Sequence, residues 1–357
     1  MKKNLFWLLA AALTVGFCTA CSDDDNDDRR DAGVVPNHAL FVVNAGNWGS
    51  GNASLSLYDP KTQEVTNEVF AALNGYKLGD TAQSMTVNDD VAWVCVNNSH
   101  IVFAIDLKTM KEKGRLTGVH SPRYICFASD EKAYLSHMYS NEITVFNPKT
   151  YTITGKITCP DMTIENGSTE EMVYEDGYLY VACWSYHKRI LKIDTKTNKV
   201  VAELEVGIQP SSIVEDDNDK LWVLCDGGQW EGNPIGYEAP TLCRINPKTM
   251  TIEKQFTFTK GDYVSRMRIN DEENRLYWIN NGALYRMSIY DDELPATPLI
   301  TGEGSFYALT LDPENEDIYA ADAIDYQQQG IIYRYTAAGQ LIDSFYGGVI
   351  PTEFCWR

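Results

Sequence analysis

The sequence predicts an all-β fold: a seven-bladed β-propeller of four-stranded antiparallel blades, with the ring closed by the C-terminal strand. Two observations predict it. One turn phrase recurs at intervals of about 40 to 50 residues, and short runs rich in β-branched and aromatic residues fill the intervals. The phrase reads YDPKT, IDLKT, FNPKT, IDTKT and INPKT, and its acidic or amide residue is Asp59, Asp106, Asn147, Asp194 or Asn246. Two degenerate copies follow at Ser288 and Thr336.

The chemistry of the phrase is that of a tight, solvated hairpin turn. An Asp or Asn side chain can accept a hydrogen bond from the backbone two residues further on, and a proline in the next position presets φ for the turn. We therefore expect each copy to form the outer hairpin of one blade.

Each interval contains four strand candidates. In the second repeat they are residues 83–87, 91–96, 101–106 and 111–117. The first repeat begins directly at residues 39–44 and lacks an innermost strand, while the chain ends in PTEFCWR. We expect this C-terminal segment to supply the missing strand, because a closed ring has no free sheet edges.

The N-terminus resembles that of a bacterial lipoprotein. A basic start precedes an apolar run at residues 5–17, which is too short to cross a bilayer but suits a secretory signal. Cys21 follows Thr19 and Ala20 as in a lipobox, although Cys18 stands where an aliphatic residue is usual. We expect a signal peptide at 1–20, a lipidated Cys21 with an acidic flexible tether at 21–36, and the propeller at 37–357. The acidic run SDDDNDDRRD resembles a surface-export signal, or is a solvated linker that says nothing about sidedness.

Composition excludes some partners. The formal net charge is -20, which argues against nucleic acid and against anionic membrane surfaces, because both require a basic footprint. Membrane attachment is expected through the lipid on Cys21 only. Seven further cysteines show no CxxC spacing, and we interpret them as small core residues and not as metal ligands.

Strand direction separates the loops into two unlike faces. The repeated turns share one face with the short polar loops between first and second strands. The other face collects the loops between second and third strands and the starts of the innermost strands, and these are rich in aromatic and amide residues. Such side chains suit a broad organic ligand with polar and apolar parts. The predicted ligand-binding residues are Trp48, Asn52, Asn98, His100, Arg123, Tyr124, His137, Tyr139, Trp184, Tyr186, Trp230, Tyr237, Arg266, Tyr307 and Tyr326.

Catalysis is poorly supported by the sequence, so no catalytic residue, metal or enzymatic activity is predicted. It contains no GxSxG, HExxH or Walker-type motif. His100, His137 and His187 occupy equivalent loops and could form a metal or axial-ligand site, but loop histidines are more often ordinary surface residues. Glu170 and Glu171 are expected to be hydrogen-bond acceptors or inert. The acidic segments 215–219 and 312–317 lack EF-hand spacing and are interpreted as solvated turns.

The lipobox at Cys21, the tether SDDDNDD and the DPKT, NPKT and DTKT turns together resemble the YncE-like propellers of gut Bacteroidetes. Within these, the layout is similar to that of the cobalamin-capturing surface lipoproteins of the BtuG type. The resemblance covers essentially the whole chain. It implies high-affinity binding of cobalamin as a transported ligand, with no other cofactor, and its hand-over to a TonB-dependent outer-membrane transporter. It also implies an outer-membrane location, lipid-anchored and facing the cell exterior.

Two other classes of protein remain open from the sequence. A glycan-binding surface lipoprotein of a polysaccharide-uptake system would use the same Trp and Tyr platforms. A protein-docking propeller would bind neither a corrinoid nor a glycan. A lactonase-like enzyme ranks below both, because no cluster of acids for a central metal is evident in the sequence.

Overall fold

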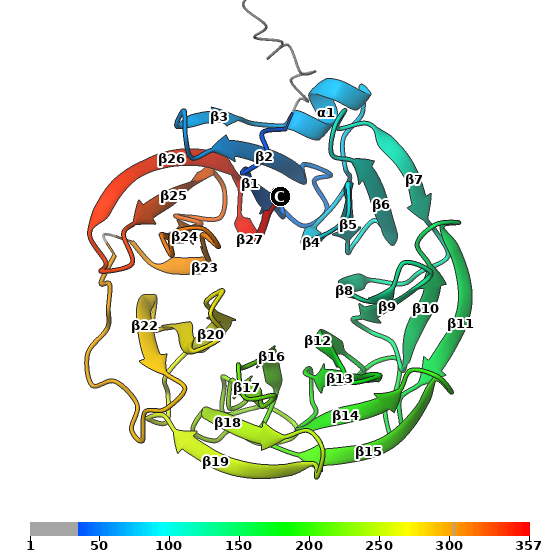
Figure 1. The fold of residues 1–357 in the computed structure, drawn as a ribbon, viewed down its shortest axis with the longest axis vertical. Coiled ribbons are helices and arrows are strands. Elements are labelled where there is room, and N and C mark those ends of the chain that lie inside the picture. Colours follow the sequence, from blue (N-terminus) through cyan, green and yellow to red (C-terminus); the bar gives the residue numbers. More distant parts are fainter. Residues whose placement is uncertain (1–34, 303) are drawn as a thin grey trace, which may run out of the picture. The chain divides into compact units, whose positions relative to one another are not determined.

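The computed structural model describes residues 35–302 and 304–357, which belong to a compact unit, Gly33–Arg357. This unit is a ring of seven antiparallel sheets around a central opening (Figure 1). The predicted seven-bladed propeller is therefore confirmed. The predicted signal peptide and Cys21 lie outside the described residues, as does the tether up to residue 34.

Blades 1 to 4 each contain four strands. In order from the axis outward, blade 1 consists of β27 (Pro351–Trp356), β1 (Leu40–Asn44), β2 (Ser54–Asp59) and β3 (Glu64–Thr66). Blade 2 consists of β4 (Ala82–Asn88), β5 (Val91–Val96), β6 (Ile101–Asp106) and β7 (Glu112–Leu116). Blade 3 consists of β8 (Pro122–Ser129), β9 (Lys132–His137), β10 (Glu142–Asn147) and β11 (Thr152–Thr158). Blade 4 consists of β12 (Thr169–Glu175), β13 (Tyr178–Cys183), β14 (Arg189–Asp194) and β15 (Lys199–Glu205).

The remaining blades follow the same order outward. Blade 5 consists of β16 (Pro210–Glu215), β17 (Leu221–Cys225), β18 (Thr241–Asn246) and β19 (Thr251–Thr257). Blade 6 consists of β20 (Val264–Ile269), β21 (Arg275–Asn280) and β22 (Ala283–Ser288). Blade 7 consists of β23 (Phe306–Leu311), β24 (Ile318–Asp322), β25 (Gln329–Tyr335) and β26 (Leu341–Val349). Helix α1 (Val69–Asn74) follows β3, and no helix of the described ranges is long and apolar enough to cross a membrane.

Blade 6 differs from the prediction because its sheet has three strands. The segment after β22 contains Pro295 and Pro298, and a proline cannot donate a hydrogen bond to a neighbouring strand. Only an isolated bridge, Leu284 to Ile300, remains where a fourth strand would pair.

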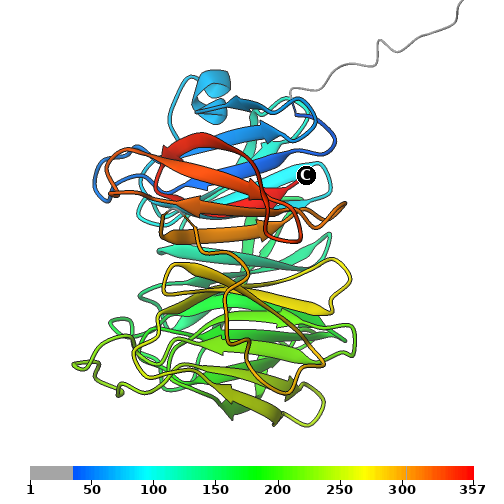
Figure 2. The same ribbon diagram turned by 90° about the vertical axis from the view of Figure 1, so that its left-hand side faces the viewer.

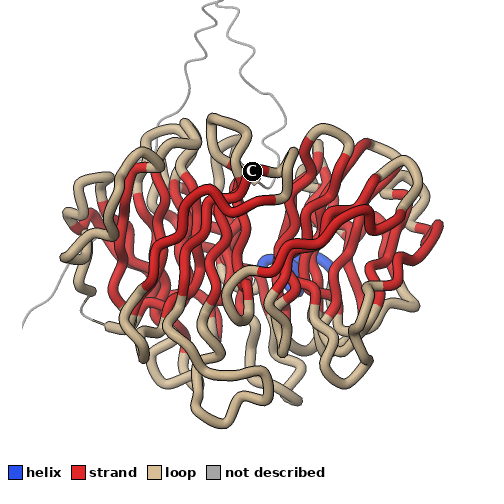
Figure 3. Tube along the Cα trace, turned by 90° about the horizontal axis from the view of Figure 1, so that it is seen from below, coloured by secondary structure: helices blue, strands red, loops and turns tan. Residues whose placement is uncertain are grey.

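The strands run between two faces that both carry loops (Figures 2 and 3). We call the face with the repeated turns the turn face, and the opposite face the cavity face. On the turn face the predicted side-chain hydrogen bonds are present. The Oδ1 atom of Asp59 accepts from the backbone N of Lys61 at 2.8 Å, and that of Asp194 accepts from Lys196 at 2.8 Å. The other three full copies of the turn are alike, at 2.9 to 3.0 Å.

The hydrophobic core lies between neighbouring blades. One aromatic residue near the start of the second strand is buried in six of the blades: Trp93, Tyr134, Tyr180, Trp222, Tyr277 and Tyr319. Each such side chain packs against the adjacent blade. The ring centroids of Trp93 in blade 2 and Phe146 in blade 3, for example, lie 5.4 Å apart. All seven cysteines of the described residues are free, and five are buried, as the sequence predicts.

The two ends of the described chain meet in blade 1. β27 pairs antiparallel with β1, with Phe41 opposite Cys355 and Val42 opposite Phe354, which confirms the predicted closure. The chain enters the ring on the turn face, where His38 stacks on Trp356 with centroids 4.7 Å apart and contacts the Asp312 carboxylate at 3.1 Å.

The turn face also carries a crowded group of acids. Burial, followed by repulsion from the carboxylates of Glu175 and Glu273, raises the pKa of Glu215 to about 7. A carboxyl group with a raised pKa binds its proton more tightly in the folded state, so its destabilising effect is present above pH 7 and disappears as the pH falls towards 4.5. We expect Glu215→Gln to stabilise the protein at pH 8 by on the order of 1 kcal/mol, after allowance for partial exposure, and to have no effect at pH 4.

Thermal unfolding followed by circular dichroism at both pH values measures this. Glu253→Gln is the matched control, because the pKa of Glu253 is shifted in the opposite direction to that of Glu215. Hydrogen bonding by Asn246 and contact with Lys220 lower the pKa of Glu253, so its replacement should destabilise the protein at pH 8. Equal shifts for both variants would contradict the prediction.

Candidate ligand-binding site

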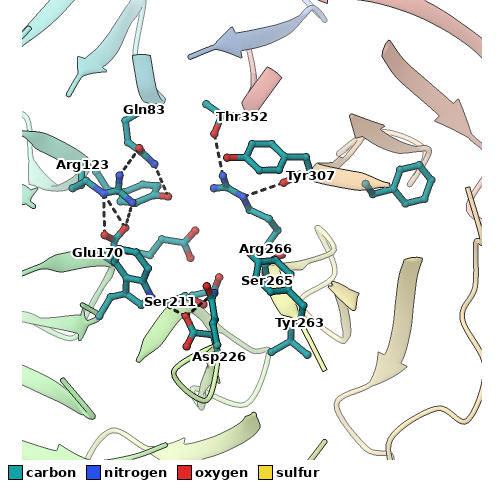
Figure 4. A pocket seen from close by; sticks show the side chains of 17 residues that line it. Gln83, Arg123, Glu170, Ser211, Asp226, Tyr263, Ser265, Arg266, Tyr307 and Thr352 are labelled. Carbon is teal, nitrogen blue, oxygen red and sulfur yellow. Dashed lines mark hydrogen bonds and ion pairs between the residues drawn. The ribbon is translucent and has the colours of Figure 1, made fainter. Parts of the chain in front are cut away.

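A cavity of about 240 Å³ opens at the centre of the ring on the cavity face (Figure 4). Every innermost strand contributes to its wall, and the loops after β13 and β17 add Trp184, Asp226 and Gln229. Pockets for drug-sized ligands usually hold about 300–1,000 Å³, so this cavity accommodates one part of a large ligand.

A β-bulge in each blade builds the cavity wall. The pairing between the innermost and second strands shifts register near the start of every innermost strand. A bulge redirects the side chain that the pairing skips. Apart from the buried Met267, the residues skipped near the starts of the innermost strands line the cavity. They are Gln83, Arg123, Tyr124, Glu170, Glu171, Ser211, Arg266, Tyr307 and Thr352.

We call the space enclosed by the seven innermost strands the channel. Two of its arginines, Arg123 and Arg268, are paired with carboxylates. Arg123 binds Glu170 through two parallel contacts, Nε to Oε1 and Nη2 to Oε2, both at 2.9 Å. Arg268 donates to Glu171 Oε1 at 2.9 Å and to both oxygens of Glu353 at 2.8 Å. Charge-assisted pairs of this geometry are strong and directional, so they fix the shape of the channel wall.

Asp226 organises the rim beside the cavity. Its buried carboxylate accepts from Trp184 Nε1 at 2.9 Å, Gly228 N at 2.8 Å and Gln229 Nε2 at 3.0 Å. Burial raises the pKa of Asp226 to about 6, against the lowering effect of these donors. The arrangement ties Trp184 in blade 4 to the long loop 226–240 of blade 5.

Five of the predicted ligand-binding residues meet in the cavity: Arg123, Tyr124, Trp184, Arg266 and Tyr307. Gln83 Nε2 donates to the Tyr124 hydroxyl at 3.2 Å. The Tyr307 ring lies 5.7 Å from the Arg266 guanidinium. The structure thus brings cationic, aromatic and hydroxyl groups from four blades to one place.

Four other predicted aromatic residues are exposed on loops of the same face: Trp48, Tyr139, Trp230 and Tyr326. Tyr326 packs edge-on against Tyr307, with ring centroids 5.7 Å apart. Trp230 belongs to the loop between β17 and β18, which projects from the ring (Figure 2). These side chains extend an aromatic surface outward from the cavity.

The remaining predicted residues do not line the cavity. The Asn52 amide caps its own loop by accepting from Asn47 N at 2.8 Å, and Asn98 donates to Asp80 at 2.6 Å. Tyr186 borders an outer hollow near Arg189. Lys260 Nζ lies 4.6 Å from the Tyr237 ring centroid.

The two histidines among the predicted residues, His100 and His137, form hydrogen bonds with neighbouring loop and strand atoms and do not line the cavity. His100 Nδ1 accepts from Ser121 N at 3.0 Å, and its ring stacks on His120. His137 is buried, and its ring nitrogens contact the His120 carbonyl at 2.6 Å and Thr144 Oγ1 at 2.8 Å. Burial lowers the pKa of His137 to about 4. Among the described residues, the one group of acids, histidines or cysteines spaced for a metal is Glu175, Glu215 and Asp219 on the turn face.

Sequence reasoning missed several cavity residues, namely Gln83, Ser211, Asp226, Gln229, Tyr263 and Thr352. A signal for some of them exists in the sequence. Polar residues interrupt the start of otherwise apolar innermost strands, as in AQSM and QPSSIV, and an interruption at the same place in successive repeats is consistent with a bulge.

A larger hollow of about 730 Å³ lies on the turn face between blades 1 and 7. It borders Pro36 and Asn37.

Fold and cavity together define the class of this protein as a seven-bladed propeller with a polar central cavity on one face. The chain belongs to the family described as "Domain of unknown function (DUF5074)", whose model matches residues 38–346. A comparison with curated proteins found no match.

Solved structures resemble the fold. A quinonprotein alcohol dehydrogenase-like protein from Bacteroides thetaiotaomicron is 15% identical, with a TM-score of 0.66 over 90% of this chain and 78% of that one. Hydrazine synthase from Kuenenia stuttgartiensis is 14% identical, with a TM-score of 0.59 over 78% and 92%. The propeller domain of Cps50 (Swd1) from Myceliophteria thermophila is 11% identical, with a TM-score of 0.61 over 81% and 95%. At these identities the similarity concerns the fold alone.

Proposed function

We propose that this protein is a non-enzymatic capture protein for cobalamin and related corrinoids, held at the outer membrane by a lipid on Cys21. It passes its ligand to a TonB-dependent transporter. One observation carries the ligand-binding part. The exposed aromatic side chains of the loops and the polar central cavity share one face of a rigid ring. The corrinoid, the lipid anchor and the transporter come from the resemblance of the sequence.

The chemistry of the ligand fits this face. A corrinoid is a flat ring bordered by amide side chains, with an apolar benzimidazole on one side. Aromatic side chains such as Trp230 and Tyr326 cover apolar surface, and the cavity offers donors and acceptors for the amides. The ligand is far larger than the cavity, so it lies across the face with one group inserted. A preformed site loses little conformational freedom on binding, which favours high affinity.

A binding role also fits the ion pairing of two of the three carboxylates that line the cavity, those of Glu170 and Glu171. Glu170 and Glu171 contact Arg123 and Arg268 at 2.9 Å. A carboxylate that acts as a general base must lie within hydrogen-bonding reach of the substrate proton. Here these side chains hold the wall of the channel, so we assign them a structural role.

Calorimetry of residues 33–357 with cyanocobalamin tests the proposal. We expect one-to-one binding that weakens by about 10- to 100-fold in Trp184→Ala, because that change removes part of the cavity wall and deprives the Asp226 carboxylate of the Trp184 donor. Trp230→Ala should weaken binding by about tenfold. Tyr290→Ala is the matched control, since Tyr290 is exposed on the turn face, and it should leave the affinity unchanged.

Absence of binding by the unaltered protein would eliminate the corrinoid assignment. A glycan array would then test the glycan-binding alternative, which uses the same aromatic side chains. Tight binding that neither tryptophan substitution weakens would retain the function and place the site elsewhere.

A further inference from the structure

Arg266 has a backbone conformation that no other described strand residue shares. Its φ is +56°, and among the described non-glycine residues with positive φ it is the only one inside a strand. The left-handed region is unfavourable for a long L side chain. Strain of this kind persists where the surrounding structure enforces it, and it concentrates at ligand-binding sites.

The strained conformation determines where the guanidinium lies. Arg266 sits in the bulge of β20, between the paired residues Ser265 and Arg268. Its side chain points into the central cavity, beside Thr352 and Tyr307 (Figure 4). Nη2 donates to Thr352 Oγ1 at 3.0 Å, and Nε donates to the Tyr307 carbonyl at 3.3 Å. These neutral acceptors orient the guanidinium without neutralising its charge.

Arg266 differs from the other two channel arginines in its acidic partners. Arg123 and Arg268 each have a carboxylate within 2.9 Å. Nη1 of Arg266 lies 3.7 Å from Glu353 Oε2, beyond hydrogen-bonding distance, and both oxygens of Glu353 are already bound by Arg268 at 2.8 Å. Arg266 is largely buried, with 17% of its side chain exposed. A buried guanidinium that has no carboxylate within hydrogen-bonding distance favours the binding of an anionic group of a ligand.

We propose that Arg266 is an anion-binding residue and that it pairs with a phosphate group of the bound ligand. Guanidinium and phosphate oxygens match in geometry. Nη1 and Nη2 of Arg266 each keep an N–H group that the hydrogen bonds to Tyr307 and Thr352 do not use. Cobalamin carries a phosphodiester between its corrin and its benzimidazole nucleotide, and this is the group that enters the cavity. The corrinoid form of the inference rests on the proposed function, whereas the affinity for phosphate does not.

Two corrinoids separate the phosphate contact from the rest of the ligand. Cobinamide has the corrin of cobalamin but lacks the nucleotide and its phosphodiester. We expect Arg266→Gly to weaken cyanocobalamin binding by about 10- to 100-fold and cobinamide binding by less than about threefold, as measured by calorimetry. Arg275→Gln removes the same charge on the turn face, from a residue paired with Glu316, and should change neither affinity. Equal losses for both corrinoids, or no loss for either, would overturn the assignment.

Glycine is the conformationally matched replacement, because it adopts a φ of +56° without strain. We therefore expect the Tm of Arg266→Gly to lie within a few degrees of that of the unaltered protein. If this variant does not fold, Arg266→Gln repeats the comparison with a polar side chain that lacks the charge.

Inorganic phosphate distinguishes failure of this inference from failure of the proposed function. If the unaltered protein binds neither corrinoid, the proposed function is wrong. The line width of the ³¹P NMR signal of inorganic phosphate, measured with and without protein, then shows whether Arg266 binds an anion. Broadening by the unaltered protein that disappears in Arg266→Gly supports the site. Broadening that persists in the variant, or none in either protein, overturns it.

Discussion

Removal of residues 351–357 is expected to prevent the protein from folding into a closed ring. β27 is the innermost strand of blade 1 and pairs with β1 from Leu40 to Asn44. Its loss exposes the edge of β1 and removes Phe354 from the core between blades 1 and 7. Losing a buried phenylalanine alone costs about 3–5 kcal/mol, a large share of the roughly 5–15 kcal/mol that stabilises a typical protein.

Size-exclusion chromatography and thermal unfolding measure this outcome. We expect the truncated chain to form higher-order species, because an exposed strand edge pairs with other chains. A circular permutant provides the control. In this permutant a short linker from Arg357 to Ala39 joins β27 to β1 as a hairpin. The two residues are close, since the Arg357 N lies 3.0 Å from the Ala39 carbonyl oxygen. The new chain ends lie between residues 292 and 293. This protein should fold, and a monomeric, cooperatively unfolding truncation would contradict the prediction.

Replacement of Arg123 by leucine is expected to destabilise the protein by about 3–5 kcal/mol, because it leaves the Glu170 carboxylate buried without its partner. Only 3% of the Glu170 side chain is exposed, and Arg123 supplies both of its parallel contacts. The lost stability corresponds to a Tm lower by roughly 4–7 °C for a protein of this size.

The double variant Arg123→Leu, Glu170→Leu is the control for this prediction. Removing both charges also removes the desolvation cost, so the double variant should be more stable than Arg123→Leu alone. Differential scanning calorimetry of the four proteins of this cycle provides the comparison. A double variant as unstable as the sum of the two single ones would mean that Arg123 and Glu170 are not energetically coupled, and it would contradict the prediction.

Local chemistry made most of the fold predictable. The turn at Asp59 depends on a hydrogen bond from the backbone of a residue two positions further on. Because both residues belong to one short segment, the turn can be recognised from the sequence. The C-terminal strand was predictable because the first repeat lacks one. Blade 6 departs from the pattern for a local reason as well, since Pro295 and Pro298 occupy the place of a fourth strand.

The cavity was less predictable because it depends on register between strands. The position of Arg266 follows from a bulge that is defined only by its pairing with β21. His137 illustrates the converse. Its loop is on the cavity face, but the ring is used by the His120 carbonyl and Thr144, and partners from separate segments cannot be read from one stretch of sequence. Asp226 likewise gains its role from Trp184, which lies in the neighbouring blade.

The point at which the chain enters the ring determines how the cavity is presented. His38 and Trp356 meet on the turn face, opposite the central cavity. The described chain therefore begins on the side of the repeated turns, and the mouth of the cavity opens on the opposite side of the ring. Under the proposed function, a transporter that takes the ligand would therefore reach it from the cavity face, opposite the side on which the described chain begins.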